Sequence, residues 1–569
     1  MNHPRTRTAL ALFALGILLA FSCKQEASPR LEYEIVKSQA DSLPALEVRM
    51  HFTADSGKTT YVRYDDEAWG QTGLFNSLRE VRLLEGQGSL LMEPDSGRIR
   101  ITHPAGAGPM VLSYKIVQDT PGPKDTRETY RPIVEPGYFH VFSHNLFALP
   151  QHYQKGDAPL VSILLKWTGW GPDEVIHNSF GNRQRTQDLG TISLEKFHSA
   201  IFVGGDFRIY ADQIQGNELY LAIRGNWIPF GDGEVMDLLS ETVRAQRQFW
   251  KDHSQPYFTV TMRPFPQDRG SSFQGTGLTN SFATSVSNNA ETELDQMGYL
   301  FNHELMHNWI GHTIENENEE EQYWFSEGFT EYYTHKNIAS QRIGGKDWGY
   351  FIGQINEGIR LLEASPVKGA PNSEITYENF WKDPEYGKLP YRRGMLFAFY
   401  LDLQLQAVSG GKYSLDDVMR DLLRASRESG QKLTHAHFLK TVGAYLPEDL
   451  TPFFNQHILH GEALPLEELF GQLGFEFQEE ADLFDLGFRF SPERTDVTAV
   501  DPGSEAYRAG VRDGDRVVSR NIYLGNTRKE VELVLERGGR RIPVAYYPVK
   551  KAPVVQLLDT EANRGKLRK

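Results

Sequence analysis

The sequence contains a single cysteine, Cys23, which lies close to the N-terminus. A lone cysteine cannot form an intramolecular disulfide, so the folded chain depends on side-chain packing for its stability. No low-complexity tract and no repeat of solenoid length occur along the chain. The composition is that of a globular protein, with 40% hydrophobic and 12% aromatic residues, and 569 residues are enough for three or four domains.

Positively charged residues are fewer than negatively charged ones. The chain has 60 lysines and arginines against 75 aspartates and glutamates, which gives a formal net charge of −15. Such a surface repels phosphate groups, so nucleic acids and anionic membrane surfaces are disfavoured as partners.

Long hydrophobic runs are limited to residues 9–21. This run of about thirteen residues is too short to span a bilayer, but it has the length of a signal-peptide core. Arg5 and Arg7 precede it, and Ser22-Cys23 follows it, which resembles a bacterial lipoprotein signal. We therefore expect a signal peptide over 1–22, a lipid on Cys23 and a tether over 23–30. The alternative is ordinary secretion with an incidental cysteine.

The lipoprotein interpretation predicts a place in the bacterial cell envelope. The protein would be an outer-membrane or periplasm-facing lipoprotein, and its lipid anchor would be its only contact with the membrane.

The most informative stretch is His303-Glu304-Leu-Met-His307. Two histidines four residues apart share one face of a helix and can bind one zinc ion, while Glu304 can hold the attacking water. Three residues at this spacing can also occur by chance, so the motif alone is only a hypothesis. Here apolar residues at helical spacing surround it, as expected for a helix. These are Leu294, Met297, Leu300, Phe301, Leu305 and Trp309.

A catalytic zinc needs a third protein ligand. A histidine six residues after His307 would complete one known pattern, but that position is Thr313, and His312 is out of register. We therefore interpret His312 as a loop residue. Glu327 lies in a second helix-like segment, at a distance that lets the chain turn and return, and is the predicted third ligand.

The segments His303–Gly311 and Trp324–Tyr333 resemble the gluzincin metallopeptidases. They are most similar to the glycyl aminopeptidase family and more distantly to aminopeptidase N. The resemblance implies a multidomain protein with an N-terminal all-β domain, a thermolysin-like α+β zinc peptidase domain with a helical region, and a C-terminal PDZ-like domain. It also implies one catalytic Zn²⁺ and a peptide or protein substrate.

The chain pattern places these parts. Short alternating strands predict the β domain over 31–230, as a platform or a carbohydrate- or protein-binding module. The catalytic domain follows over 231–340 and the helical region over 341–475. We expect the PDZ-like domain over 480–552 and a disordered tail over 553–569.

The strand and loop near residue 275 are expected to line the substrate site. The residues are Gly275, Gly277, Leu278, Thr279 and Asn280. In the resembled families an acid, which binds the substrate's free amino terminus in aminopeptidase N-like enzymes, stands where Thr279 stands here. A hydroxyl cannot neutralise an ammonium group, so strict aminopeptidase activity is in doubt.

Other acids could replace the missing one. Glu291 and the run over 319–321 are the candidates, although such a run is more typical of a solvated surface loop.

Two further residues follow from the resemblance. Tyr391 matches a tyrosine that donates to the oxyanion, and Arg393 replaces the lysine that follows it. Glu331 lies one helical turn after Glu327 and could accept a hydrogen bond from a zinc-bound histidine, or it could be an exposed acid.

The last module resembles a PDZ domain. Leu486-Gly487-Phe488 matches a carboxylate-binding loop, and a C-terminal peptide is a conceivable ligand, as is packing without any ligand.

Together these observations predict a zinc metallopeptidase in which a metal-activated water attacks the peptide bond and Glu304 is the general base. Aminopeptidase and endopeptidase activity both stay open. The alternative is a catalytically inactive peptide-binding or scaffold lipoprotein that uses its PDZ-like domain.

Overall fold

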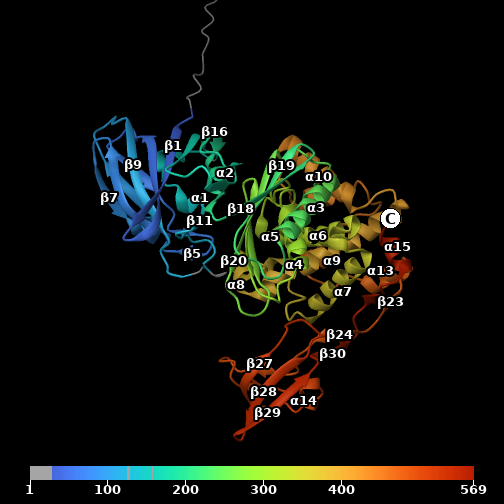
Figure 1. Ribbon diagram of the computed structural model, residues 1–569. Helices are drawn as coiled ribbons and strands as arrows, with labels where there is room; N and C mark the ends of the chain where they lie inside the picture. The colour runs from blue at the N-terminus through green and yellow to red at the C-terminus, as the bar shows by residue number, and fades with distance from the viewer. Residues whose placement is uncertain (1–27, 123, 125–127, 157, 569) are drawn as a thin grey trace, which may run out of the picture.

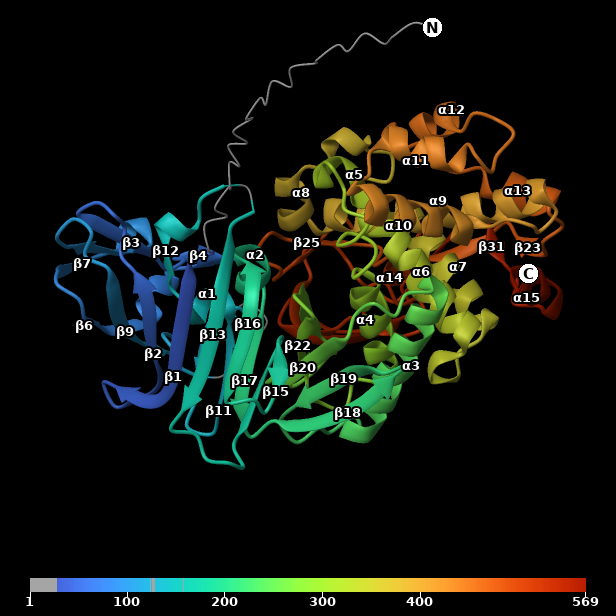
Figure 2. The same cartoon turned by 90° about the horizontal axis from the view of Figure 1, so that it is seen from above.

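The computed structural model describes residues 28–568 apart from 123, 125–127 and 157. The predicted signal peptide and Cys23 lie outside the described residues, as does most of the tether. Figures 1 and 2 show a β-rich N-terminal part beside a helical part, with a smaller C-terminal module that extends away from both. None of the helices in the described ranges combines the length and the apolar character needed to cross a membrane.

The N-terminal part is built from three main sheets around one apolar core. Alternation explains its strands: Leu31, Tyr33 and Ile35 of β1 are fully buried while the residues between them face outward. The first sheet contains β16 (Thr186–Ser193), β13 (Leu160–Thr168), β1 (Arg30–Ala40), β2 (Leu43–Thr53), β9 (Pro109–Val117) and β6 (Leu78–Glu85).

The second and third sheets complete this part. The second contains β10 (Ile133–Val134), β11 (Tyr138–Phe142), β17 (Ile201–Gly205), β14 (Val175–Asn178) and β15 (Gly181–Asn182). The third contains β12 (Leu149–Pro150), β3 (Thr59–Arg63), β8 (Arg98–Thr102) and β7 (Ser89–Glu93). Two short helices and a hairpin accompany them: α1 (Ser143–Leu146), α2 (Leu194–His198), β4 (Glu67–Ala68) and β5 (Gln71–Thr72).

The boundary predicted at residue 230 is wrong, because the strands over 208–223 belong to the next sheet. That five-stranded sheet contains β18 (Arg208–Ile214), β19 (Asn217–Ile223), β20 (Tyr257–Phe265), β22 (Ser281–Ser287) and β21 (Phe273–Leu278). Alternation in the sequence identifies a strand but not its partner. Here β19 pairs in parallel with β20 across the intervening helix α3.

Helices pack against this sheet and extend beyond it. The first four are α3 (Asp232–Trp250), α4 (Leu294–Met306), α5 (Glu319–Ser326) and α6 (Gly328–Gln341). The helices that follow are α7 (Trp348–Ala364), α8 (Tyr377–Lys382), α9 (Pro384–Ser409), α10 (Leu415–Ser429), α11 (His435–Val442), α12 (Thr451–Phe454) and α13 (Leu466–Gln472). The longest, α9, runs through the largest apolar core.

The C-terminal module has an apolar core of its own. Its elements are β24 (Ala481–Phe484), β25 (Arg489–Phe490), β26 (Val497–Thr498), α14 (Glu505–Arg508), β27 (Arg516–Asn521), β28 (Val531–Arg537), β29 (Arg540–Tyr546) and β30 (Val549–Ala552). The chain enters through β24 and leaves through β30, which pair with each other (Figure 1).

The segment after 552 is folded, in contrast to the predicted disordered tail. β31 (Gln556–Leu557) pairs with β23 (Phe477–Gln478), and α15 (Glu561–Leu567) packs beside α7. Leu557 and Leu567 are buried, and Arg564 donates to Asp347 at the start of α7. The basic composition of the tail suggested disorder, but two of its leucines, Leu557 and Leu567, belong to the helical core.

Deleting residues 553–569 should therefore destabilise the helical part. Losing the packing of two buried leucines costs about 3 kcal/mol or more, at about 1.5–3 kcal/mol per buried side chain. Urea unfolding followed by tryptophan fluorescence would show a lower midpoint than for a control that lacks only residues 568–569. Equal midpoints would contradict the packing role of α15.

Candidate functional site

Helix α4 presents two histidines beside its apolar stripe, on a different face. Met297, Leu300, Phe301 and Leu305 pack into the core between α4 and the five-stranded sheet. His303 and His307, four residues apart, therefore face away from the sheet toward α6 and α9.

The third ligand candidate, Glu327, lies at the junction of α5 and α6. Its Oε2 atom is 3.4 Å from His303 Nε2 and 3.7 Å from His307 Nε2. The predicted zinc ligands are thus together, and they form a group of potential metal-ligating atoms within 4.8 Å of one another.

Hydrogen bonds fix the tautomers of both imidazoles. His303 Nδ1 donates to Glu331 Oε2 at 3.0 Å, and His307 Nδ1 donates to the carbonyl of Ile310 at 3.1 Å. When each neutral ring carries its proton on Nδ1, its Nε2 presents a lone pair. Both Nε2 lone pairs then face the same carboxylate oxygen.

Glu327 Oε2 itself is buried and has no hydrogen-bond partner among the residues that the structure describes. A buried carboxylate oxygen that meets two imidazole lone pairs requires a cation for compensation. Two nitrogens and one carboxylate oxygen are a ligand set typical of catalytic zinc, which keeps a fourth position open. The residues present therefore fit Zn²⁺.

Two glycines set the position of Glu327 relative to α9. A Cβ built on Gly328 would lie 2.4 Å from the Cα of Gly394, and a Cβ built on Gly394 would lie 2.0 Å from the carbonyl oxygen of Trp324. Neither position tolerates a side chain, so the α5–α6 junction and α9 pack backbone to backbone. This contact places Glu327 beside Tyr391.

Glu331 supports the histidine ligand from behind, as its spacing predicted. It accepts hydrogen bonds from His303, from the hydroxyl of Tyr299 at 2.9 Å and from His335 at 3.2 Å. Burial acts to raise the pKa of Glu331, but the hydrogen bonds from His303 and His335 hold that pKa well below its usual range. A carboxylate in this place orients His303 and raises its basicity.

Glu304 is buried beside the ligand group without belonging to it. Burial raises the pKa of Glu304 to about 7, while the charges of His303 and Lys388 act in the opposite direction. A carboxyl group with a pKa near neutrality can both accept and release a proton.

Tyr391 lies against the same site. Its ring stacks on that of His303, with centroids 5.7 Å apart and planes at 15°. Burial, and then the charge of Glu327, raise the pKa of Tyr391 well above its ordinary value, so its hydroxyl is a neutral donor.

Arg393 differs from the expectation that it replaces an active-site lysine. It is buried on another face of α9 and donates to the backbone carbonyls of Lys368 and Ala370. The cation that reaches the site is Lys388, whose ammonium lies 4.6 Å from the centre of the Tyr391 ring. The spacing of three residues between Lys388 and Tyr391 on one helix was the available signal.

The predicted substrate loop forms the end of the sheet. β21 holds the outer position, next to β22, and Thr279-Asn280 make the turn between them. Within the described chain no other strand pairs with β21. Gly275 is required here, because a Cβ on it would lie 2.2 Å from the ring of Phe282.

Thr279 is bound to the N-terminal part. Its hydroxyl donates to the carbonyl of Lys196 at 2.7 Å, and its N–H donates to the carbonyl of Ser199. The substitutes considered for the missing acid are also engaged. Glu291 accepts from Gly270 N, Glu319 from Asn316 and Ser326, and Glu320 from Tyr377 N.

His312 is closer to the substrate strand than a surface-loop interpretation implies. Its imidazole carbon lies 3.3 Å from where a Cβ on Gly277 would stand. The charge of His307, after burial, lowers the pKa of His312. His312 thus lies between the edge strand and the ligand helix.

The predicted carboxylate-binding loop of the C-terminal module is occupied by its own chain. Gly487 N donates to Asp485 Oδ1 at 2.7 Å, its carbonyl accepts from Asp501 N, and Phe488 is buried in the module core. The Leu486 carbonyl accepts from the Tyr546 hydroxyl. The N–H of Gly487 is therefore not free for the carboxylate of a ligand.

Comparison with known proteins identifies the fold. No family model matches the chain. The crystal structure of an aminopeptidase N family protein from Idiomarina loihiensis aligns with 94% of this chain and 100% of its own, at a TM-score of 0.68 and 17% identity. An M1 zinc metallopeptidase from Deinococcus radiodurans aligns with 77% of this chain and 94% of its own, at a TM-score of 0.43 and 13% identity.

One sequence match is local. Leucine aminopeptidase 2 of Ajellomyces capsulatus is 28% identical over 136 residues, which are 23% of this chain and 21% of that protein. The match thus spans about a fifth of the relative's length. The alignment with the Idiomarina protein shows that the chain has the fold of that aminopeptidase N family protein.

We expect one zinc ion per chain. His307→Ala removes a ligand and should abolish stoichiometric binding, while Glu331→Gln should weaken binding by about 10- to 100-fold because His303 loses its charged partner. Competition with a chromogenic chelator, together with elemental analysis, measures both effects. Glu304→Gln is the matched control and should keep the metal; retention of zinc by His307→Ala would refute this ligand set.

Proposed function

We propose that the protein is a zinc-dependent peptidase related to the aminopeptidases. The observation that carries the proposal is the buried Glu327 oxygen that faces two imidazole lone pairs, with Glu304 beside them. The fold shared with an aminopeptidase N family protein and the local match to a leucine aminopeptidase support the same reaction class.

His303, His307 and Glu327 would hold the zinc, which as a Lewis acid polarises the scissile carbonyl and activates water. Glu304 accepts the proton of the attacking water and transfers it to the leaving amine. Tyr391 donates its phenolic proton in a hydrogen bond to the oxyanion as it develops. The free edge of β21 can bind the peptide backbone as an added strand.

This division of roles predicts how two variants differ. Glu304→Gln should abolish peptide hydrolysis, and Tyr391→Phe should reduce kcat by about 10²- to 10³-fold, the usual effect of losing one oxyanion donor. Both should retain zinc. Turnover of a mixed peptide library by the form that lacks residues 1–23 measures these effects. If wild type and Glu304→Gln are equally inert while zinc is bound, the chain is a peptide-binding or scaffold protein instead.

The kind of peptidase depends on the turn at Thr279. Among the described residues, no acid stands in the place where aminopeptidases bind the substrate amine, and Thr279 is turned to Lys196 and Ser199. An atypical aminopeptidase and an endopeptidase both fit this geometry.

Thr279→Glu tests whether the missing acid limits recognition of the substrate amine. If the missing anchor limits amine recognition, the variant should cleave free-amino peptides better than acetylated ones, because a carboxylate pairs with the ammonium. The ratio of kcat/KM for the two substrate forms is the measurement, and Thr279→Gln controls for size. A ratio equal to that of wild type would show that the amine is bound elsewhere or not at all.

The surroundings of the enzyme are proposed from the sequence alone. Lipidation at Cys23 would tether the peptidase to the bacterial envelope, where it meets extracytoplasmic peptides. The PDZ-like character of the C-terminal module is likewise a proposal. The hydrogen bond from Gly487 to Asp485 favours packing over capture of C-terminal peptides.

A further inference from the structure

An exposed tryptophan of the N-terminal part belongs to an aromatic group that reaches the substrate strand β21 through Tyr130. Trp69 is 41% exposed although it is one of the largest apolar side chains. It forms the turn between β4 and β5 together with Gly70, and both residues have positive φ, 48° for Trp69 and 73° for Gly70. Asn, Asp and Gly are the residues preferred in such turns. A tryptophan held in this conformation is an outlier from which a functional role can be inferred.

Trp69 belongs to an aromatic group that extends toward the substrate strand. Its ring packs edge-on against Tyr130 at 5.3 Å, Phe142 at 5.1 Å and His144 at 4.3 Å. The hydroxyl of Tyr130 donates to the carbonyl of Gly275 in β21 at 3.4 Å. Trp69, Tyr130 and Phe142 thus form an aromatic wall that ends at the free edge strand.

Tyr130 connects the wall to the proposed substrate strand. Its hydroxyl bonds to β21 at Gly275, so the wall adjoins the strand along which a peptide would lie. Burial raises the pKa of Tyr130 to about 12, and the charge of Glu304 contributes to the increase. No feature of the sequence indicated that Tyr130 contacts β21, because the two lie far apart in the chain and in different parts of the fold.

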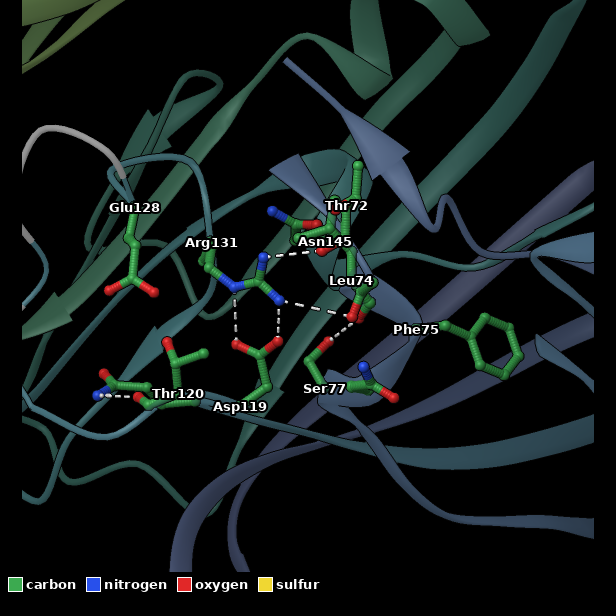
Figure 3. A network of polar contacts seen from close by, with 12 residues as sticks. Thr72, Leu74, Phe75, Ser77, Asp119, Thr120, Glu128, Arg131 and Asn145 are labelled. Atoms are coloured by element: carbon green, nitrogen blue, oxygen red, sulfur yellow. Dashed lines mark hydrogen bonds and ion pairs between the residues drawn. The ribbon is translucent and has the colours of Figure 1, made fainter. Parts of the chain in front are cut away.

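The polar contacts of Arg131 hold the segments that carry Tyr130 and the β4–β5 hairpin, and Figure 3 shows Arg131 with Asp119. Arg131 pairs through two nitrogens with Asp119, whose side chain is 2% exposed, and donates to the carbonyl of Thr72 at 2.9 Å and that of Gly73 at 3.5 Å. Because Arg131 follows Tyr130 and Thr72 ends β5, the same guanidinium anchors the tyrosine and the hairpin.

A second hydrogen bond completes this arrangement. Asn145 of α1 donates to the carbonyl of Tyr130 at 2.6 Å. The wall is thus held rigidly by contacts that lie away from its exposed surface. A rigid aromatic surface loses little conformational entropy when it receives a ligand.

We propose that Trp69 and Tyr130 form a specificity subsite that accepts a large apolar side chain, aromatic or leucine-like, of a peptide lying along β21. Aromatic walls bind such side chains through area burial and edge-on ring contacts. That the bound peptide is a substrate rests on the proposed peptidase function. The binding of its apolar side chain by the aromatic wall does not depend on hydrolysis.

The test compares Trp69→Ala with wild type on peptides that differ only in Phe against Ala, with the exchange moved along the sequence. At one position the Phe/Ala ratio of kcat/KM should fall by about 10- to 100-fold, the discrimination that an apolar pocket achieves. Tyr547→Ala, which removes an aromatic residue 50% exposed on the C-terminal module, is the matched control and should keep the ratio. Trp69→Phe should restore part of it.

A binding experiment makes the result independent of turnover. Fluorescence anisotropy gives the Phe/Ala ratio of Kd for labelled peptides on Glu304→Gln with and without Trp69→Ala. A shifted ratio without any hydrolysis by wild type would retain the subsite and reject the peptidase. A Phe/Ala ratio of Kd that Trp69→Ala leaves unchanged at every position would overturn the subsite. An equal loss of affinity for all peptides, together with a lower melting temperature, would also overturn it.

The face of a tryptophan can also bind the ammonium group at the start of a peptide. Comparing acetylated with free-amino peptides distinguishes this binding from binding of a side chain. If Trp69→Ala weakens binding of free-amino peptides alone, whatever their side chains, the wall binds the ammonium through cation–π attraction. That outcome would also overturn the side-chain proposal.

Discussion

The site depends on the backbone contact between Gly328 and Gly394. Only glycine at both positions lets the α5–α6 junction lie directly on α9, since any Cβ would overlap backbone atoms. This contact brings Glu327 to His303 and His307, and Tyr391 of α9 to His303. The ligand geometry therefore originates in helix packing, and the buried Glu327 oxygen without a partner is its consequence.

Helix α4 connects this packing to the sheet. Its apolar face is buried against the sheet core and its histidine face is turned to α6, so the fold and the site use different faces of one helix. Glu331 links the two helices through His303 and Tyr299. The charge of a buried carboxylate is acceptable here because three hydrogen bonds compensate it.

The N-terminal part contacts the edge strand β21 and the turn that follows it. Tyr130 reaches β21, and the hydroxyl of Thr279 is bound to Lys196. The edge strand that would hold a substrate is thus bordered by residues from both parts of the chain. A change in this interface would alter the substrate side of the site without touching the zinc ligands.

Some features were within reach of the sequence because they are local. The histidines, Glu304 and Glu331 follow from helical spacing, and alternation located the strands. The partners of those strands were not predictable, which is why 208–223 was included in the N-terminal domain. The motif gave the position of Arg393 along α9 but not the carbonyls of Lys368 and Ala370 that surround its side chain. The tail was misjudged because its two buried leucines matter only against α7 and β23.

The sequence by itself determined which polar groups the chain carries: two imidazoles and three carboxyl groups in two helix-like segments, and a hydroxyl where the resembled families have a carboxylate. Only the tertiary structure decided that Glu327 meets both histidines, that Lys388 rather than Arg393 faces the site, and that Trp69 and Tyr130 border it. The physical reason is that periodicity defines which residues share one face of one element. Convergence of different elements is instead set by packing between residues far apart in the chain.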